Sequence, residues 1–404
     1  MNDPRHISIE DFDYVLPADR IALEPSAERG TSRLLKWQKG RLEHGQFAQI
    51  VDWLPSNTAL ILNETKVIPA RLYFQKETGA VIEIFCLDPI GQDHQMAMSA
   101  TKESTWRCMI GGAKKWKDGF LSKKVELEGN ELLLHVERLE NEEGDFQVRF
   151  FWDNQRFSFS EILAAVGEMP LPPYIEREVE ESDEERYQTV FAKREGSVAA
   201  PTAGLHFTDA ILDQLNQNGV DLLRLTLHVS SGTFKPVSAE KMEGHDMHTE
   251  TFVVPLQVIE AILADTKRNF IPVGTTSLRT IESLYWIGVK LLENGNEGLL
   301  ELHQWDCYDL PQTVSLEASF GALKRYADER QIQTLQGGTA LLIAPGYTFR
   351  VAKGLITNFH MPKSTLILLV SAIVGDDWRR IYQYALDKGF QFLSYGDSSL
   401  LLPE

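Results

Sequence analysis

Cysteine is scarce in this chain, and long apolar runs are absent from it. Only three cysteines occur in 404 residues (Cys86, Cys108 and Cys307), and no Cys-x-x-Cys pair is present. Three cysteines cannot form a disulfide framework, which favours a reducing compartment. The longest apolar run, Leu366–Val374, is well short of the roughly 20 residues that a membrane helix needs. The acidic N-terminus also lacks the apolar core of a secretory signal. We therefore expect a cytoplasmic protein with no membrane partner.

Several nucleotide-binding motifs are missing as well. The sequence has no GxxxxGK[ST] phosphate loop, no GxGxxG fingerprint and no glycine loop of the Rossmann methyltransferase type. These absences argue against ATP hydrolysis, NAD chemistry and ordinary methyl transfer.

Positive charge is in the minority, because 40 Lys and Arg face 58 Asp and Glu and the formal net charge is −18. This balance argues against a general nucleic-acid coat protein, but a local basic face is enough to bind RNA. One such segment has seven cations against two acids, Glu103 and Asp118, with Trp106 and Trp116 interleaved. On charge alone, a solvated hairpin rim is at least as good an interpretation. The seven candidate RNA contacts are Lys102, Arg107, Lys114, Lys115, Lys117, Lys123 and Lys124.

The hydrophobic pattern divides the chain into two parts. Residues 67–154 have an all-β pattern, with alternation over 81–86, a hairpin signal at Gly129-Asn130 and no convincing helix. The remainder alternates strands and helices, with Ser158 and Thr208 as predicted helix caps and a strand expected at 341–344. We predict an α/β fold (multidomain α+β). A discontinuous α/β main domain (1–66 plus 155–404) would hold a small inserted all-β barrel (67–154), with an extra surface excursion at 293–335.

Small residues dominate the segment from Ser197 to Thr208, just before a predicted helix. They allow a ligand to approach the backbone closely, and His206 lies on this loop. The alternative is a tight connection with His206 hydrogen-bonded in the core. Function is slightly favoured, because so many small residues are costly in a plain connector. The candidate substrate contacts here are Thr202, Ala203 and Gly204.

A second turn, Val273–Arg279, leads from a strand into a helix that Thr276 or Ser277 is expected to cap. Free N–H groups at a helix start bind carboxylate or phosphate. Arg279 lies in the first turn, where a cation gains nothing from the helix dipole, so an anionic partner is expected. That partner is either a ligand or Glu282, three residues on.

Two further turns follow strands near the C-terminus. Asn358 and His360 lie where a strand enters a loop, at the edge where α/β sheets usually bind ligands, although bonding to nearby backbone is about as good an interpretation. Tyr395 and Asp397 offer an aromatic face and a charge that suit a sulfonium cation, although a terminal strand with a capping Asp is the simpler interpretation. His245 and His248 have metal-like spacing, but no further ligand is signalled, so no metal is expected.

Taken in order, these segments resemble the S-adenosylmethionine:tRNA ribosyltransferase-isomerase family of queuosine synthesis. The resemblance covers nearly the whole chain apart from about 293–335. The matching stretches are Phe12–Tyr14, Ser32–Leu35, Asn63–Arg71, Leu171–Ile175, Glu185–Val190, Ser197–Thr208, His228–Val237, Met247–Glu250, Gly274–Arg279, Pro345–Tyr347, Thr357–His360, Ser364–Leu366 and Ser394–Asp397.

The resemblance implies an enzyme that takes S-adenosylmethionine as co-substrate and ribosyl donor. It would transfer and isomerise the ribose onto 7-aminomethyl-7-deazaguanine at the wobble position of tRNA. Epoxyqueuosine would form, and adenine and methionine would leave. The resemblance also implies the fold of the family, a discontinuous α/β domain with an inserted β-barrel, which agrees with the division described above. It further implies a monomer or weak oligomer without a metal.

This reaction needs a base, an acid, an anion site and a neighbour for the sulfonium. His206, His228 and His360 are the candidate acid and base, because histidine titrates near neutrality. Thr276, Ser277 and Arg279 are the candidates for the methionine carboxylate, and Tyr395 and Asp397 for the sulfonium.

This chain departs from the family pattern at Glu64, Gly30, Ser230 and Gln391. These departures leave two alternatives: a paralogue that uses the same donor on another nucleic-acid or small-molecule acceptor, and a non-catalytic RNA-binding homologue.

Overall fold

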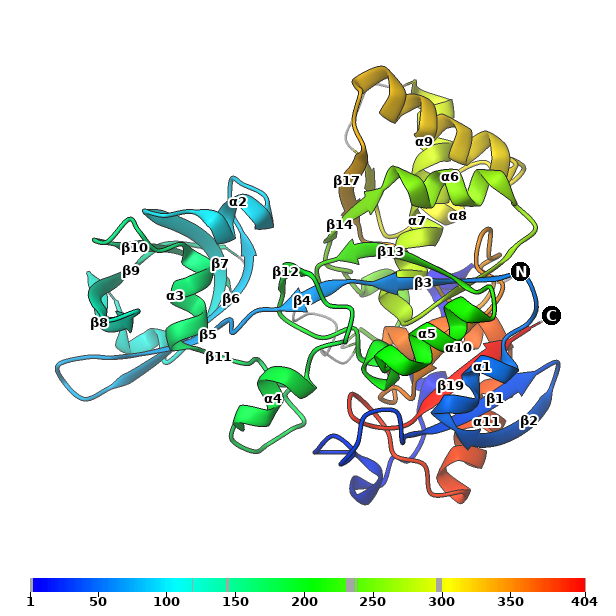
Figure 1. Cartoon of the computed structure of the whole chain (residues 1–404), viewed down its shortest axis with the longest axis horizontal. Coiled ribbons are helices and arrows are strands. Elements are labelled where there is room, and N and C mark those ends of the chain that lie inside the picture. The colour runs from blue at the N-terminus through cyan, green and yellow to red at the C-terminus, as the bar shows by residue number, and fades with distance from the viewer. Residues whose placement is uncertain are drawn as a thin grey trace.

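The computed structural model describes residues 3–117, 119–142, 145–229, 237, 239–295 and 300–403, without the side chains of 140–142. Asp118 and Ser230, named above, lie outside these ranges. Figure 1 shows a mixed α/β molecule with two bodies joined by a narrow connection. The smaller body is a curled sheet, and the larger carries two further sheets and most of the helices.

A six-stranded sheet forms the centre of the larger body. Its order is β15 (Asn269–Pro272), β3 (Thr58–Asn63), β13 (Asp221–Leu227), β14 (Glu250–Pro255), β17 (Thr334–Thr339) and β16 (Glu301–Leu302). Strands β15, β3 and β13 are parallel, and β14 pairs antiparallel with both of its neighbours. All six residues of β3 are buried, as expected for a central parallel strand covered on both faces.

Helix α7 (Thr275–Asn294) packs against this sheet and is buried from Thr275 to Val289. Helices α6 (Leu256–Ala264) and α9 (Leu316–Arg330) pack on the same core. Phe320 and Leu323 of α9 are fully buried there. The stretch 293–335, expected to form a surface excursion, thus includes described side chains that pack in this core, and short helix α8 (Asp306–Asp309) belongs to the same stretch.

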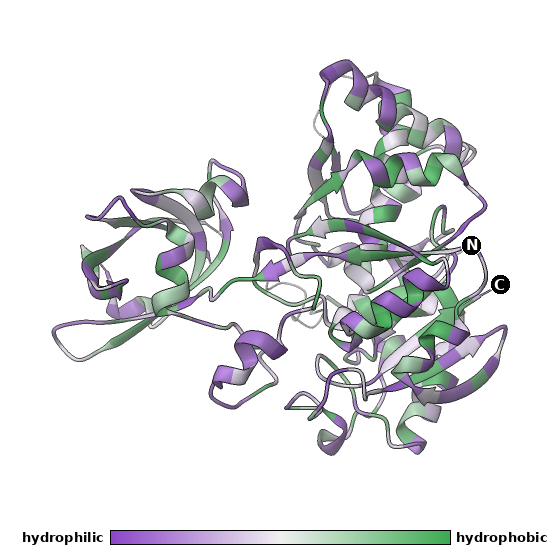
Figure 2. Ribbon diagram, viewed as in Figure 1, coloured by the Kyte–Doolittle hydropathy of each residue, from purple (hydrophilic) through white to green (hydrophobic). Residues whose placement is uncertain are grey.

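A second sheet has the order β18 (Leu355–Asn358), β19 (Ser398–Leu402), β1 (Arg33–Gln38) and β2 (Arg41–Gln46). Helices α10 (Thr365–Val374) and α11 (Asp377–Asp387) belong to its core, while α1 (Ile50–Trp53) and α5 (Asp209–Gln217) pack between the sheets. Figure 2 shows green and purple residues alternating along α5, as expected for a helix with one buried face.

The curled sheet has the order β11 (Gly167–Glu168), β5 (Arg71–Gln75), β6 (Val81–Pro89), β7 (Glu103–Gly111), β10 (Asp145–Trp152), β9 (Asn130–Glu142) and β8 (Phe120–Leu127). Helix α3 (Phe159–Val166) fills its concave side (Figure 1). Among the described residues, its two edge strands are not hydrogen-bonded to each other, so the sheet is curled rather than a closed barrel.

The chain passes between the bodies through β4 (Thr65–Val67), which pairs in parallel with β12 (Arg194–Ser197), and returns past α4 (Glu181–Arg186). The small-residue segment that follows β12 forms a 3-10 helix, Thr202–His206.

Several local predictions are confirmed. Ser158 and Glu161 form a capping box on α3, and Thr208 caps α5 by accepting a hydrogen bond from Ile211 N at 3.2 Å. The predicted hairpin joins β8 to β9, with its turn at Glu128–Gly129, one residue earlier than expected.

Two local predictions are wrong. Residues 341–344 form no strand, because their N–H groups have scattered partners instead of one strand: Leu341 N donates to Thr339 Oγ1, Leu342 N to Gln304 O and Ala344 N to Tyr308 Oη. The stretch expected to lack helices contains α2 (His94–Ser99), which Asp93 caps through Met96 N at 2.8 Å. Six residues are too few to show a helical period.

Candidate functional site

A pocket opens where three of the predicted motifs meet in the larger body, and it is called the main pocket below. It holds about 820 Å³ of empty space, part of it open to solvent. Its lining comes from 199–203, 274–276, 357–361 and 393–394, together with Tyr174, Val229, Ser364 and Leu366.

Backbone pairing brings these loops together. Val273 N donates to Ile61 O at 2.8 Å, and Gly274 N donates to Ile356 O at 2.8 Å. The start of α7 therefore lies beside the end of β18. Gly274 has φ +87°, a conformation that a side chain would strain. The main pocket thus forms at the carboxyl ends of strands, where α/β sheets usually bind ligands.

His206 is held at both ring nitrogens rather than facing the main pocket. Asn358 Nδ2 donates to Leu393 O at 2.9 Å, so Asn358 Oδ1 accepts from His206 Nε2 at 2.9 Å. His206 Nδ1 then accepts from Ser32 Oγ at 2.7 Å. Burial lowers the pKa of His206 to about 4, so the ring is neutral. Its position behind Asn358 fixes the amide that lines the main pocket.

His360 does line the main pocket. Its Nε2 lies 3.0 Å from Thr357 Oγ1, and its backbone N donates to Tyr382 Oη at 3.2 Å. Burial lowers the pKa of His360 to about 3, which leaves the imidazole neutral.

His228 lies in a different place. It lines a cleft between the curled sheet and the six-stranded sheet, called the side cleft below, while its neighbour Val229 lines the main pocket. Most of the residues that line the side cleft are polar or charged, and the cleft holds about 1320 Å³ of empty space, part of it open solvent. The structure therefore separates the three candidate histidines into the main pocket, the wall behind it and the side cleft.

The predicted anion site is only partly assembled. Thr276 lines the main pocket, and its Oγ1 accepts from Asn63 Nδ2 at 3.4 Å. Ser277 is fully buried, and its Oγ has no hydrogen-bond partner in the described structure. The helix cap is Gly274 rather than Thr276 or Ser277.

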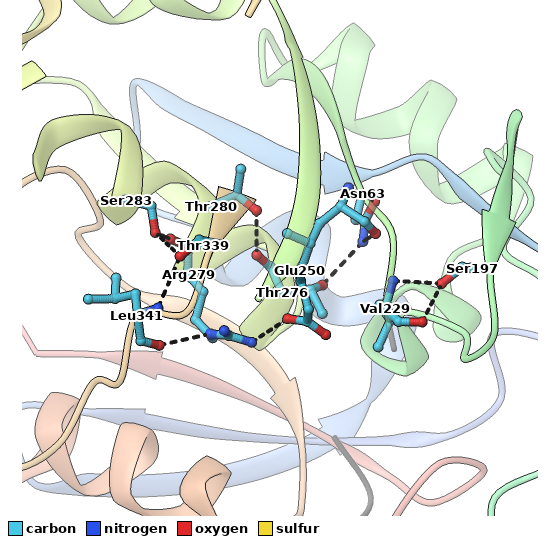
Figure 3. A network of polar contacts seen from close by, with 11 residues as sticks. Asn63, Ser197, Val229, Glu250, Thr276, Arg279, Thr280, Ser283, Thr339 and Leu341 are labelled. Carbon is cyan, nitrogen blue, oxygen red and sulfur yellow. Dashed lines mark hydrogen bonds and ion pairs between the residues drawn. The ribbon is translucent and has the colours of Figure 1, made fainter. Parts of the chain in front are cut away.

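Arg279 points away from the main pocket. Figure 3 shows its guanidinium reaching Glu250 of β14 and the carbonyl of Leu341. Glu282 is not its partner, because that carboxylate accepts from Tyr347 Oη at 2.7 Å and from Val351 N at 2.9 Å. The anionic partner of Arg279 is thus the buried side chain of Glu250 on strand β14.

The predicted sulfonium neighbours also lie outside the main pocket. Asp397 accepts from Arg33 N at 2.7 Å and from Gln391 N at 2.9 Å, and burial raises its pKa. Tyr395 Oη donates to Asp183 Oδ1 at 2.9 Å. Both side chains are held by the fold, as in the simpler interpretation of this turn.

Only some of the predicted contacts in the small-residue segment line the main pocket. Thr202 and Ala203 line the main pocket. Gly204 instead allows close packing, since a Cβ there would lie 2.7 Å from Thr189 Cγ2 and 2.8 Å from Phe191 Cζ.

The seven basic candidates do not gather in one cleft. Arg107 lines a pocket adjoining the side cleft and pairs with Asp88. Lys114, Lys115 and Lys117 follow β7, and Lys123 and Lys124 lie on β8. Lys102 precedes β7 and, with Lys114, Lys115, Lys117 and Lys124, is exposed. Trp106 and Trp116 are at most 1% exposed, so their rings cannot stack on bases.

Residues that the motifs did not single out complete the main pocket. Tyr174 lines it and bonds to Ser394 Oγ, and burial raises the pKa of Tyr174 to about 12. Tyr174 lies in the stretch Leu171–Ile175, which matches the family pattern and could have pointed to it. Asn63 was likewise within a matching stretch, and it ties β3 to Thr276 and to Leu227.

Within the described ranges, no group of three or more His, Cys, Asp or Glu side chains is placed to hold a metal ion. None of the helices in the described part of the chain is long and apolar enough to span a bilayer.

Comparison with known proteins places these features in a family. The family described as "Queuosine biosynthesis protein" matches residues 9–401. A S-adenosylmethionine:tRNA ribosyltransferase-isomerase of Desulfitobacterium hafniense is 38% identical over 98% of this chain and 100% of its own length. The enzyme of the same name from Trichlorobacter lovleyi is 36% identical over 98% and 99%.

A solved S-adenosylmethionine tRNA ribosyltransferase from Thermotoga maritima is 26% identical, covers 97% of this chain and 100% of its own, and has a TM-score of 0.46. With sequence similarity that runs almost from end to end, the chain belongs to the S-adenosylmethionine:tRNA ribosyltransferase-isomerase family of queuosine biosynthesis.

Proposed function

We infer that this chain transfers and isomerises the ribosyl group of S-adenosylmethionine onto 7-aminomethyl-7-deazaguanine in tRNA. The product is epoxyqueuosine, and adenine and methionine are released. The observation that carries this inference is the 36–38% identity to enzymes of this name over nearly all of both chains. The main pocket supports it, because the matching segments at 199–203, 274–276 and 357–360 meet there.

In this proposal the main pocket binds the donor. The methionine carboxylate accepts hydrogen bonds from N–H groups at the start of α7, near Thr275 and Thr276. The rings of Tyr174 and Phe359 are the aromatic neighbours of the sulfonium, in place of Tyr395. This placement leaves Arg279, Ser277 and Asp397 with structural roles.

His360 is the proposed proton acceptor on the donor side. It lines the main pocket and is neutral, so it is able to take a proton from the carbon beside the sulfonium. The same imidazolium then returns a proton to the departing adenine. Asn358, fixed by His206, is the proposed orienting group for the donor.

The side cleft is the proposed approach for the acceptor. A tRNA is far too large for the main pocket, whereas the side cleft is open and passes beside His228, next to Val229 in the wall of the main pocket. We assign residues 67–154 as an inserted β domain, and its exposed Lys102, Lys114, Lys115, Lys117 and Lys124 as candidate backbone contacts.

The test measures adenine and methionine release from S-adenosylmethionine with tRNA that carries 7-aminomethyl-7-deazaguanine, and with unmodified tRNA. We expect release only with the modified tRNA. His360→Ala should lower kcat by about 100-fold or more, while the exposed His303→Ala serves as control. Donor binding without release from the modified tRNA would instead indicate a different acceptor.

A further inference from the structure

A helix of the curled sheet places a second histidine against His228. Helix α2 packs on β12, and the ring centroids of His94 and His228 lie 4.2 Å apart with 26° between their planes. The ring centroid of Trp106 lies 6.0 Å from that of His94, with 81° between the two ring planes. The two histidines are only 5% and 6% exposed, yet both line the side cleft.

Gly196 makes this stack possible. A Cβ at that position would lie 2.8 Å from His94 Cδ2 and 2.9 Å from His228 Cε1. Any side chain would therefore push one ring away. His228 is fixed further by Thr65, whose Oγ1 lies 3.1 Å from His228 Nδ1.

The polar surroundings of the two rings differ. His94 Nε2 is buried without a hydrogen-bond partner in the described structure, and it lies 3.9 Å from Asp88, which pairs with Arg107. Asp93 caps the helix that carries His94. The charged side chains around His228 form pairs: Arg194 with Glu64 at 3.4 Å and Lys66 with Glu195 at 2.9 Å, and Lys193 also lines the side cleft.

We propose that His94 is a positioning residue for His228, and that it holds this imidazole in one orientation at the floor of the side cleft for work on the acceptor. The role on the acceptor rests on the proposed function. The two rings come from different bodies, so this arrangement exists only while the curled sheet is docked on the larger body.

The chemistry of the acceptor explains what a fixed, neutral imidazole does there. An aminomethyl group is an ammonium at neutral pH and must lose a proton before its nitrogen lone pair can bond to carbon. In the tautomer whose Nδ1–H donates to Thr65 Oγ1, Nε2 of His228 carries the lone pair that accepts this proton, and the imidazolium forms. Burial first, and then the neighbouring His94 and Arg194, lower the pKa of His228, so the ring is neutral beforehand.

The experiment follows the His228 ring by NMR titration in the full-length protein, beside kcat and KM for the modified tRNA. We compare His94→Ala, which removes the stacked ring, with His94→Phe, which keeps an aromatic ring without nitrogens. His135→Ala is the matched control, because His135 also stacks on a ring, that of Phe151 at 4.9 Å, within the same sheet. Thermal unfolding of each variant checks that it is folded.

With His94→Ala, the titration midpoint of His228 should rise towards its usual value near 6.5. In the same variant kcat below pH 7 should fall by about tenfold or more, with the KM for S-adenosylmethionine unchanged. His94→Phe and His135→Ala should resemble the wild type. The proposal is overturned if His94→Ala leaves the His228 titration unchanged, or if His94→Phe shifts it as much as His94→Ala does.

Failure of the proposed function has a different signature. If His228→Gln retains full turnover while His94→Ala still shifts the His228 titration, positioning holds and the catalytic assignment of His228 is wrong. If the wild type releases no adenine with modified tRNA, the acceptor assignment is wrong, and the titration still decides whether His94 positions His228.

Discussion

Arg279 and Glu250 form a charge pair with side chains only 7% and 3% exposed. Breaking such a pair leaves one buried charge without its partner. We expect Arg279→Met to lower the free energy of unfolding by about 3–5 kcal/mol, measured by denaturant titration. Any loss of activity in this variant would then follow from loss of folded protein.

The control for this prediction is Lys124→Met, which breaks the exposed pair between Lys124 and Glu131 at 2.8 Å. Little change is expected there, because exposed pairs are screened by solvent. Arg279→Met with unchanged stability and lost donor binding would instead restore Arg279 to the binding site.

Burial of His206 makes the stability of the folded protein depend on pH. Its folded pKa of about 4 lies below the value near 6.5 expected when the chain is unfolded, so the unfolded state takes up the proton first. This contribution to stability is complete above pH 6.5 and is lost as pH falls towards 4, by about 3 kcal/mol in all. His206→Gln cannot titrate, so its unfolding free energy should fall less between pH 7 and 5 than that of the wild type. Parallel curves for the two proteins would contradict this account.

For single residues, the sequence predicted which kind of partner a side chain needs better than it predicted which residue supplies that partner. Arg279 was expected to need an anion, and it has one, but Glu250 is distant in sequence and only strand pairing brings it near. Glu282 had suitable helical spacing, yet it accepts from backbone N–H groups of residues 350–352. Spacing along one helix cannot reveal such contacts with other segments.

Helices α7 and α9 approach each other closely at Gly288. A Cβ there would lie 2.3 Å from both the backbone and hydroxyl oxygens of Ser319. We expect Gly288→Ala to lower the free energy of unfolding by about 1–3 kcal/mol, as overpacking does, measured by thermal or denaturant unfolding.

Gly321→Ala on α9 is the matched substitution. Its Cβ would meet only the tip of the Arg325 side chain, at 3.5 Å. Alanine favours helix over glycine by about 1 kcal/mol, so this variant should be as stable as the wild type or more so. Equal losses in the two variants would show that the helices do not pack as described.

Elements with strong local signals were predictable. Helix α10 coincides with the longest apolar run of the chain, and the Ser158–Glu161 box marks the start of α3. Residues 341–344 are as apolar as a strand, but their N–H groups donate to separate partners such as the Thr339 side chain and the Gln304 carbonyl. The apolar sequence pattern of this stretch shows that its side chains are buried, but the tertiary fold decides which groups bond to its backbone.

On the whole-molecule scale, the exposed cations of the curled sheet should determine how tRNA binding depends on salt. Replacing Lys114 and Lys117 by Gln should weaken binding and reduce the slope of log K against log salt by about 1 for each lost phosphate contact. Binding titrations at several salt concentrations would measure this slope.

The comparison pair is Lys39 and Lys388, two exposed lysines of the larger body, replaced by Gln in the same way. They should leave the slope unchanged. If both pairs weaken binding equally, the curled sheet is not the preferred surface for RNA.

The division into an all-β stretch and an alternating α/β remainder was visible in sequence, because strand and helix periods differ. The order of strands was not. Strand β3 lies between β15 and β13, both more than 150 residues later, and such distant pairings leave no local pattern.

Strand β19 has a consequence for how each copy of the protein is made. The curled sheet draws all its strands from Arg71–Glu168, so it is able to form while the rest of the chain is still being synthesised. Strand β19, from Ser398–Leu402, lies between β1 and β18 and emerges from the ribosome after every other strand of the described sheets. The part proposed to meet RNA is therefore able to form early, while the sheet that carries Asn358 to the main pocket is completed only after its last strand, β19, has been made.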